Sequence, residues 1–123
     1  MNDFSAGATL KSAFFKLMGM QISDIDNIKQ LFISKSGLEV GGPSRVFRDE
    51  GYVPLYRFVK ELDGCNFSNT TIWEGNINSG KNYNYYKNRK GMQYISEASD
   101  LSLIPDSKYD FVISSNCLEH VAN

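Results

Sequence analysis

The sequence lacks an apolar run of the roughly 20 residues that a bilayer-spanning helix needs, and its N-terminus lacks the regions of a signal peptide. It also lacks a charge surplus, because 13 lysines and arginines stand against 14 acidic residues, for a net charge of -1. Bulk electrostatics therefore favour neither nucleic acid nor an anionic membrane as a partner. We expect a cytoplasmic protein.

Cysteine and histidine are scarce. The only cysteines are Cys65 and Cys117, which have no CxxC spacing, and His120 is the single histidine. A zinc site built from cysteine and histidine would have too few ligands. We expect both thiols to be reduced and no metal to be bound.

What is present indicates one globular domain of the α/β class. The chain has 123 residues, of which 41% are hydrophobic and 22% charged, as is ordinary for a folded domain. Apolar strand-like segments alternate with segments of helical spacing. The run Phe111-Val112-Ile113 is continuously apolar, which is typical of a parallel strand covered on both faces.

The predicted elements follow from periodicity and turn residues. Helices are expected over 8–20 and 23–32. Residues 54–62 have helical spacing, although a strand over 58–65 competes with that interpretation. The expected strands cover residues 38–40, a segment ending at 64–67, residues 92–98 and residues 110–115.

Residues 68–91 are polar and rich in asparagine, and they predict a long irregular connection. Basic residues alternate there with Tyr83, Tyr85 and Tyr86. Such a pattern can contact nucleic acid by stacking and charge, but we expect a solvated loop because the rest of the chain adds no basic face.

A glycine-rich turn, Gly41-Gly42-Pro43-Ser44, follows the first predicted strand. Glycine permits positive φ and close approach of a ligand to the backbone, and the turn N–H groups can meet an anion. The chain lacks both G-x-G-x-x-G and the phosphate P-loop pattern, so a pyrophosphate ligand is disfavoured. A tight structural loop remains the alternative.

Three segments together resemble the class I S-adenosylmethionine-dependent methyltransferases of the type 11 kind. Glu39 and Gly41 match the family's acidic residue and first glycine, while Pro43 and Arg45 stand where two further glycines are usual. A bacterial subgroup with Glu-Ile-Gly-Gly-Pro-Ser is similar here. The segments Ser96–Leu101 and Tyr109–His120 resemble the family's third and fourth strand ends.

The resemblance implies a Rossmann-like, mostly parallel sheet with flanking helices, and S-adenosylmethionine as cofactor. It implies that Asn66, with Asp63 as second choice, contacts the ribose. It names no catalytic base, since His120 fits a packed helix start better. The other implied cofactor contacts are Glu39, Val40, Gly41, Gly42, Pro43 and Ser44 at the methionine end, Glu97 and Ala98 at the adenine, and Asn116 and Cys117 at the fourth strand end.

The resemblance also implies a domain with more strands than the sequence predicts. We therefore expect a helical cover over 1–35 and a partial methyltransferase domain over 36–123, truncated after the fourth strand. The methyl acceptor is expected to be a small molecule or a glycan. Two other interpretations stay open: a non-catalytic module that binds a partner through a sheet edge, and, less favoured, a nicotinamide-dependent oxidoreductase. Glu39 itself has the alternative role of tying loop backbone together.

Overall fold

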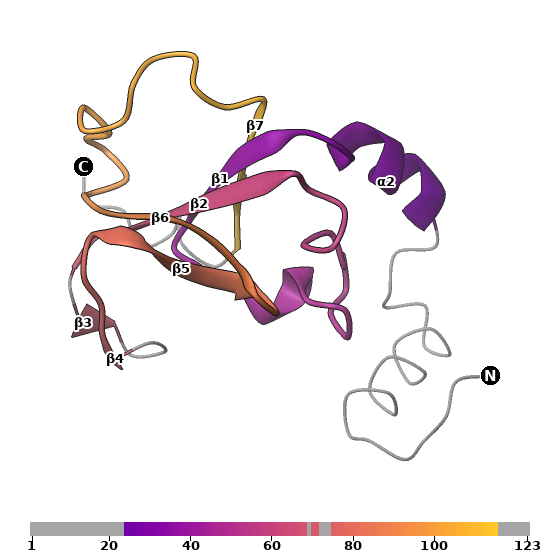
Figure 1. The fold of residues 1–123 in the computed structure, drawn as a ribbon, viewed down its shortest axis with the longest axis horizontal. Coiled ribbons are helices and arrows are strands. Elements are labelled where there is room, and N and C mark those ends of the chain that lie inside the picture. Colours follow the sequence, from indigo (N-terminus) through magenta and orange to yellow (C-terminus); the bar gives the residue numbers. More distant parts are fainter. Residues whose placement is uncertain (1–23, 69, 72–74, 116–123) are drawn as a thin grey trace.

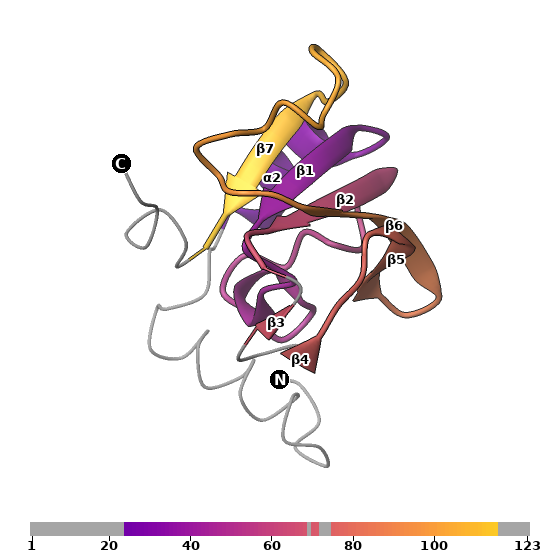
Figure 2. The same cartoon turned by 90° about the vertical axis from the view of Figure 1, so that its left-hand side faces the viewer.

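The computed structural model describes residues 24–68, 70–71 and 75–115. Its centre is a five-stranded sheet in the order β5-β6-β2-β1-β7 (Figures 1 and 2). A small antiparallel pair, β3 and β4, lies on the side of the molecule away from the helix α2 (Figure 1). The elements are α2 (Ile25–Phe32), β1 (Ser36–Val40), the 3-10 helix η1 (Arg45–Phe47), β2 (Glu61–Asn66), β3 (Thr70–Thr71), β4 (Gly75–Asn76), β5 (Gly80–Tyr86), β6 (Arg89–Ile95) and β7 (Phe111–Ser114).

The sheet is mixed and mostly parallel. β1 pairs in parallel with β2 on one side and with β7 on the other, and β2 pairs in parallel with β6. Only β5, at one edge, runs antiparallel, to β6. The four predicted strands thus exist and confirm the α/β class, and they lie side by side in the order third, second, first, fourth. The chain builds the sheet outward from β1 in one direction and then returns to the other side of β1.

The prediction of an irregular loop over 68–91 is wrong. Much of that segment forms β3, β4, β5 and the start of β6. Along β5, Tyr83 and Tyr85 are buried and Asn82 and Asn84 are exposed. This alternation is the signature of a strand with one covered face, and the polar composition hid it.

The predicted helix over 54–62 is also wrong, and the competing strand is nearer the truth. Residues 54–60 form turns, and β2 begins at Glu61. Leu62 lies in the middle of the sheet, opposite Gly37 of β1. Pairing with a neighbouring strand has overridden the helical spacing of the apolar residues.

The prediction of flanking helices is met only by α2 among the described residues. It confirms the helix expected over 23–32, of which only residue 23 lies outside the described part. The helix expected over 8–20 lies outside it altogether. None of the residues of α2 is buried. Phe32 packs edge-on against Phe111 of β7, with ring centroids 4.7 Å apart. Phe32 also packs against the first apolar cluster, so the helix meets the sheet near the start of β7.

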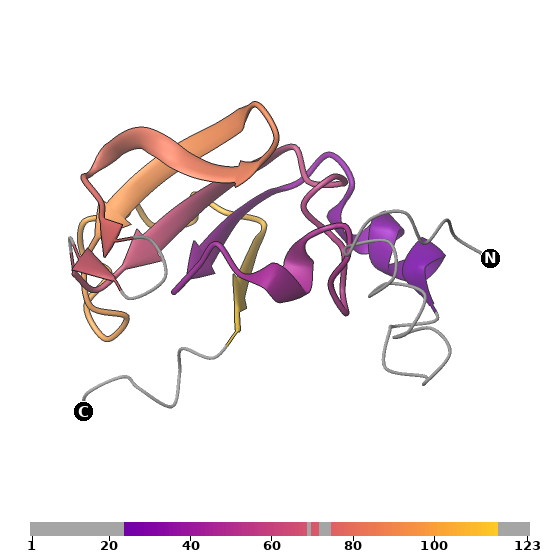
Figure 3. The ribbon, with the colours of Figure 1, turned by 90° about the horizontal axis from the view of Figure 1, so that it is seen from below.

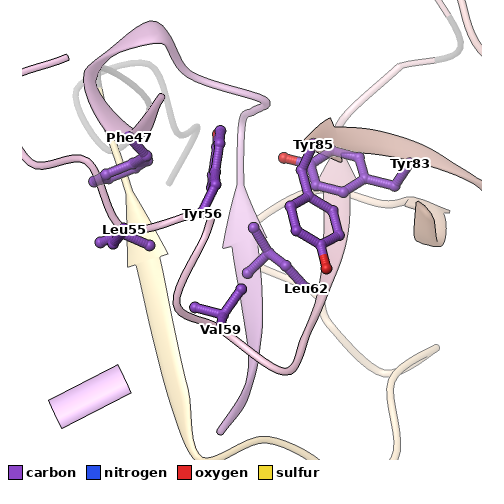
Figure 4. Packing of buried hydrophobic residues seen from close by; sticks show 7 residues of the cluster. All are labelled: Phe47, Leu55, Tyr56, Val59, Leu62, Tyr83 and Tyr85. Atoms are coloured by element: carbon purple, nitrogen blue, oxygen red, sulfur yellow. The ribbon is translucent and has the colours of Figure 1, made fainter. Parts of the chain in front are cut away.

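Two apolar clusters hold the sheet, one on each face. On one face the connection between β1 and β2, which contains η1, lies against β2 and β5 (Figure 3). On the other face the connection between β6 and β7 covers Leu38, Val40 and Cys65. The first cluster consists of Phe47, Leu55, Tyr56, Val59, Leu62, Tyr83 and Tyr85 (Figure 4). Among the described residues, no helix is long and apolar enough to cross a membrane.

Candidate functional site

The candidate site lies at the carboxyl ends of the parallel strands. The Gly41–Ser44 turn leaves β1 there, between the ends of β2 and β7. Because β2 and β6 were added on one side of β1 and β7 on the other, the connections diverge at this point. In open α/β sheets such a divergence leaves a crevice outside the strand ends, and ligands bind in it.

Glu39 is the central charged residue of this edge and is fully buried. Its Oε2 accepts hydrogen bonds from the hydroxyls of Tyr56 and Tyr83, both at 2.7 Å. Its Oε1 accepts from the Ser44 N–H at 3.1 Å, and the same N–H donates to the Tyr56 oxygen at 2.7 Å. The carboxylate therefore joins the turn, the β1–β2 connection and the edge strand β5.

Burial and these donors act on the ionisation of Glu39 in opposite directions. Desolvation is the larger effect and raises the pKa of the carboxyl above 4.5, while the hydrogen bonds from Tyr56, Tyr83 and Ser44 lower it. The pKa of Tyr56 is raised in turn, first by its own burial and then by the charge of Glu39. The raised pKa keeps the Tyr56 hydroxyl protonated, so it donates to Glu39.

The turn is shaped around this carboxylate. Gly41 has a φ of 84°, which glycine adopts without strain. A Cβ on Gly42 would lie 2.2 Å from Glu39 Cδ and 2.3 Å from the Tyr83 hydroxyl. The Gly41 N–H donates to the Cys65 carbonyl at 2.8 Å, and the Ser44 N–H is occupied as described. These two N–H groups are used within the protein, as a tight structural loop would use them.

Asn66 ends β2 beside the turn and is almost fully buried. Its Nδ2 donates to the Gly42 carbonyl at 3.0 Å, which sets the orientation of the amide. Its Oδ1 is buried and has no hydrogen-bond partner among the described residues. A buried acceptor without a donor is costly and calls for an explanation.

Asp63, the second choice for the ribose contact, is already engaged. Its carboxylate accepts from the Met92 N–H at 2.7 Å and from the Tyr109 hydroxyl at 2.6 Å, and Lys108 Nζ lies 3.3 Å away. Burial raises the pKa of Tyr109 most, and the hydrogen bond to Asp63 raises it further. This group fastens the β6–β7 connection to β2, so of the two candidates Asn66 has the free acceptor.

The remaining predicted cofactor contacts lie in different surroundings. Glu97 is exposed in the turn after β6, and its carbonyl accepts from the Asp100 N–H at 3.0 Å. Ala98 packs on the apolar cluster of Leu38. Asn116 and Cys117 lie outside the described residues. The edge thus brings Glu39 to Ser44 together with Asn66, and Ala98 lies against the cluster that contains Val40.

A hollow of about 500 Å³ opens where β2 and β6 end. Apolar side chains and small polar ones share its lining, which comprises Phe67, Ser68, Ile77, Asn78, Ser79 and Ile95. Sequence reasoning missed these residues, as it missed Tyr56 and Tyr83, because none belongs to a motif. Only the alternation of Tyr83 and Tyr85 carried a local signal.

Comparisons with models of protein families, with curated proteins and with solved structures find no match to this chain. Among the described residues, no group of three or more His, Cys, Asp or Glu side chains lies together in a way that could hold a metal ion. What the geometry defines is an α/β protein whose strand-end edge carries a buried carboxylate network and an adjoining hollow. Function is therefore argued from that edge.

Proposed function

We propose that the chain forms the cofactor-binding part of a Rossmann-like S-adenosylmethionine-dependent methyltransferase. The observation that carries the proposal is the order of the parallel strands, third-second-first-fourth, with the Glu39–Ser44 segment at the point where the order reverses. That order and that position are those of a nucleoside site in doubly wound sheets. The motifs at Glu39–Ser44, Ser96–Leu101 and Tyr109–His120 favour S-adenosylmethionine over a dinucleotide.

The orphaned oxygen of Asn66 supports a nucleoside ligand at this edge. A ribose hydroxyl is a donor that would satisfy Oδ1, while Nδ2 keeps its bond to Gly42. The hollow at the ends of β2 and β6 adjoins that position in the chain, since its lining begins at Phe67. Phe67 and Ile95 offer apolar surface for a flat base, and the exposed Glu97 could accept from its amino group.

S-adenosylmethionine would supply a methyl group already activated by its sulfonium sulfur. The chain would then contribute mainly by holding cofactor and acceptor in line. Glu39 would act through the turn, because its bonds to Ser44, Tyr56 and Tyr83 set the loop on which the cofactor rests. The Gly41 and Ser44 N–H groups are occupied, so the cofactor's carboxylate would need other donors.

The acceptor is proposed, from the resemblance alone, to be a small molecule or a glycan, and the reaction to occur in the cytoplasm. No described residue is proposed as a catalytic base.

Calorimetric titration of the chain with S-adenosylhomocysteine tests the proposal, because this product keeps the nucleoside and amino-acid parts of the cofactor. We expect saturable binding to the original chain and binding weaker by about tenfold for Asn66→Ala, from the lost hydrogen bonds. Asn88→Ala, an exposed asparagine in the β5–β6 turn, is the matched control and should bind like the original chain.

Titration with NAD distinguishes the oxidoreductase interpretation from the methyltransferase proposal. Saturable binding of NAD without binding of S-adenosylhomocysteine would overturn the methyltransferase proposal, as would equal affinities of the original chain and a folded Asn66→Ala variant.

A further inference from the structure

A second hollow, of about 260 Å³, lies between β5, the β4–β5 segment and the turn after β1. It shares Ile77 and Asn78 with the larger hollow and touches the turn at Pro43. Five of its lining residues carry carboxamides, and none of its lining residues is charged. The lining residues are Pro43, Asn76, Ile77, Asn78, Asn82, Tyr83, Asn84 and Gln93.

From this lining we infer that the hollow binds the vicinal hydroxyls of an uncharged sugar ring. A carboxamide offers two donors and an acceptor in one plane, so it can bond two neighbouring hydroxyls, each of which also donates and accepts. An anion would require cationic or backbone donors, and a cation would require carboxylates. Neither kind of side chain lines this hollow.

The strand β5 places Asn82 and Asn84 beside this hollow, and both are exposed. The ladder to β6 is irregular between Gly80 and Tyr83, so the strict alternation of side chains is broken next to Asn82. The alternate residues Tyr83 and Tyr85 are held in the core, with ring centroids 6.3 Å apart. The buried tyrosines fix β5 against the sheet, and so fix the spacing of the two amides.

Gln93 supplies a buried polar group to the same hollow, at 3% exposure. Its Nε2 donates to the Tyr94 carbonyl at 3.0 Å and to the Gly64 carbonyl at 3.5 Å. With both N–H groups directed at backbone, the group that Gln93 offers to a ligand is its carbonyl oxygen. It accepts from a sugar hydroxyl, while the exposed amides supply donors.

The volume agrees with a ligand of this size. Small-molecule sites commonly enclose roughly 300–1,000 Å³, so a hollow of about 260 Å³ suits one ring and is small for a dinucleotide. Sugar binding by these amides does not depend on the methyltransferase proposal. Only a role as acceptor subsite, suggested by the contact with Pro43, rests on that proposal.

The test is a titration of the ¹⁵N-labelled chain followed by NMR, with glucose, galactose and N-acetylglucosamine as separate probes. At least one should produce saturable shifts of the side-chain amide signals of Asn82, Asn84 or Gln93, with a dissociation constant on the order of 1 mM. The double variant N82A/N84A should bind about tenfold more weakly. Asn88→Ala should bind like the original chain.

Asn82→Asp with Asn84→Asp is the second variant, since it keeps side-chain shape and removes the donors. It should lose affinity as the alanine variant does. Absence of saturable shifts with all three sugars, or unchanged affinity in a folded N82A/N84A chain, overturns the inference.

S-adenosylhomocysteine is a fourth probe in the same NMR titration, because its ribose also carries vicinal hydroxyls. Shifts of the hollow with this nucleoside and none with the hexoses would assign the hollow to the cofactor's ribose and overturn a site for a free sugar. Failure of the nucleoside to bind, with hexose shifts present, supports the sugar site and removes only the methyltransferase proposal.

Discussion

Glu39 is a buried carboxylate whose partners come from three separate segments. Tyr56 and Tyr83 donate to the same oxygen, and Ser44 donates to the other. A buried charge is tolerated only when its hydrogen-bonding capacity is used. The stability of this edge therefore depends on hydroxyl groups that no sequence motif identifies.

Tyr83→Phe tests that dependence. Removal of one hydroxyl leaves the buried carboxylate with fewer donors, so the free energy of unfolding should fall by about 1–3 kcal/mol in urea denaturation at neutral pH. Tyr86→Phe is the matched control, because the Tyr86 hydroxyl bonds the exposed Asp49 at 2.9 Å. The control should lose less than about 0.5 kcal/mol. Equal losses would show that Glu39 does not need the Tyr83 hydroxyl.

The raised pKa of Glu39 predicts a dependence of stability on pH. Burial raises the pKa of the Glu39 carboxyl in the folded chain above 4.5. The contribution of Glu39 to stability is therefore present below that value and is lost as pH rises through the raised pKa.

Urea denaturation of the original chain and of Glu39→Gln, over about pH 4 to 8, measures this contribution. The original chain should lose stability relative to the variant as pH rises. Glu61→Gln changes an exposed glutamate and should leave the pH profile unaltered. A constant difference between the original chain and Glu39→Gln at all pH values would contradict the assignment.

At the scale of elements, the edge strand β5 is held to the sheet through a close approach to β2. A Cβ on Gly64 would lie 2.1 Å from the ring of Tyr83. Tyr83 can therefore reach Glu39 across β2 only because residue 64 has no side chain. Arg89 adds to the attachment of this hairpin by donating to the carbonyls of Tyr56, Val59 and Lys60.

Gly64→Ala should lower the free energy of unfolding by about 1–3 kcal/mol, because the ring must shift to admit a methyl group. A double-mutant cycle gives the control. In the background of Tyr83→Val, which keeps a strand-forming residue but removes the ring, the same change should cost less than about 0.5 kcal/mol. Equal costs in both backgrounds would place the strain elsewhere than at Tyr83. Chemical denaturation of the four chains supplies the measurement.

Elements that are marked by a local sequence pattern were predicted correctly, and elements that depend on contacts between distant residues were not. The helix α2 and the strand β7 were predicted with nearly correct bounds, because local periodicity and a continuous apolar run mark them. The helix over 54–62 was wrong, because Leu62 packs between strands that are distant in sequence. The strand β5, and with it the hairpin to β6, was missed, because the outward residues of β5 are asparagine and lysine.

At the scale of the whole molecule, a ligand that binds the folded chain alone must stabilise it. S-adenosylhomocysteine at about 100 times its dissociation constant should raise the free energy of unfolding by about 2.7 kcal/mol. Urea denaturation with and without the ligand measures this gain, and NAD at the same concentration should produce none. A calorimetric affinity without the corresponding gain would indicate binding to the unfolded chain as well.

The candidate site was predictable only in part. Glu39, the glycine turn and Asn66 were named from the sequence, and they do meet at one edge of the sheet. Their detailed roles were not predictable. The carboxylate proved to be enclosed by tyrosines, and the free acceptor proved to be Asn66 Oδ1 and not Asp63.

The sequence by itself determined the α/β class, the four parallel strands and the place of the turn after β1, because these depend on the hydrophobicity of neighbouring residues and on glycine. Tertiary structure alone decided the strand order, the antiparallel edge strand β5 and the network around Glu39. The physical reason is distance along the chain. Tyr83 and Glu39 are brought together by strand pairing and by a glycine at residue 64, and short-range periodicity does not encode that contact.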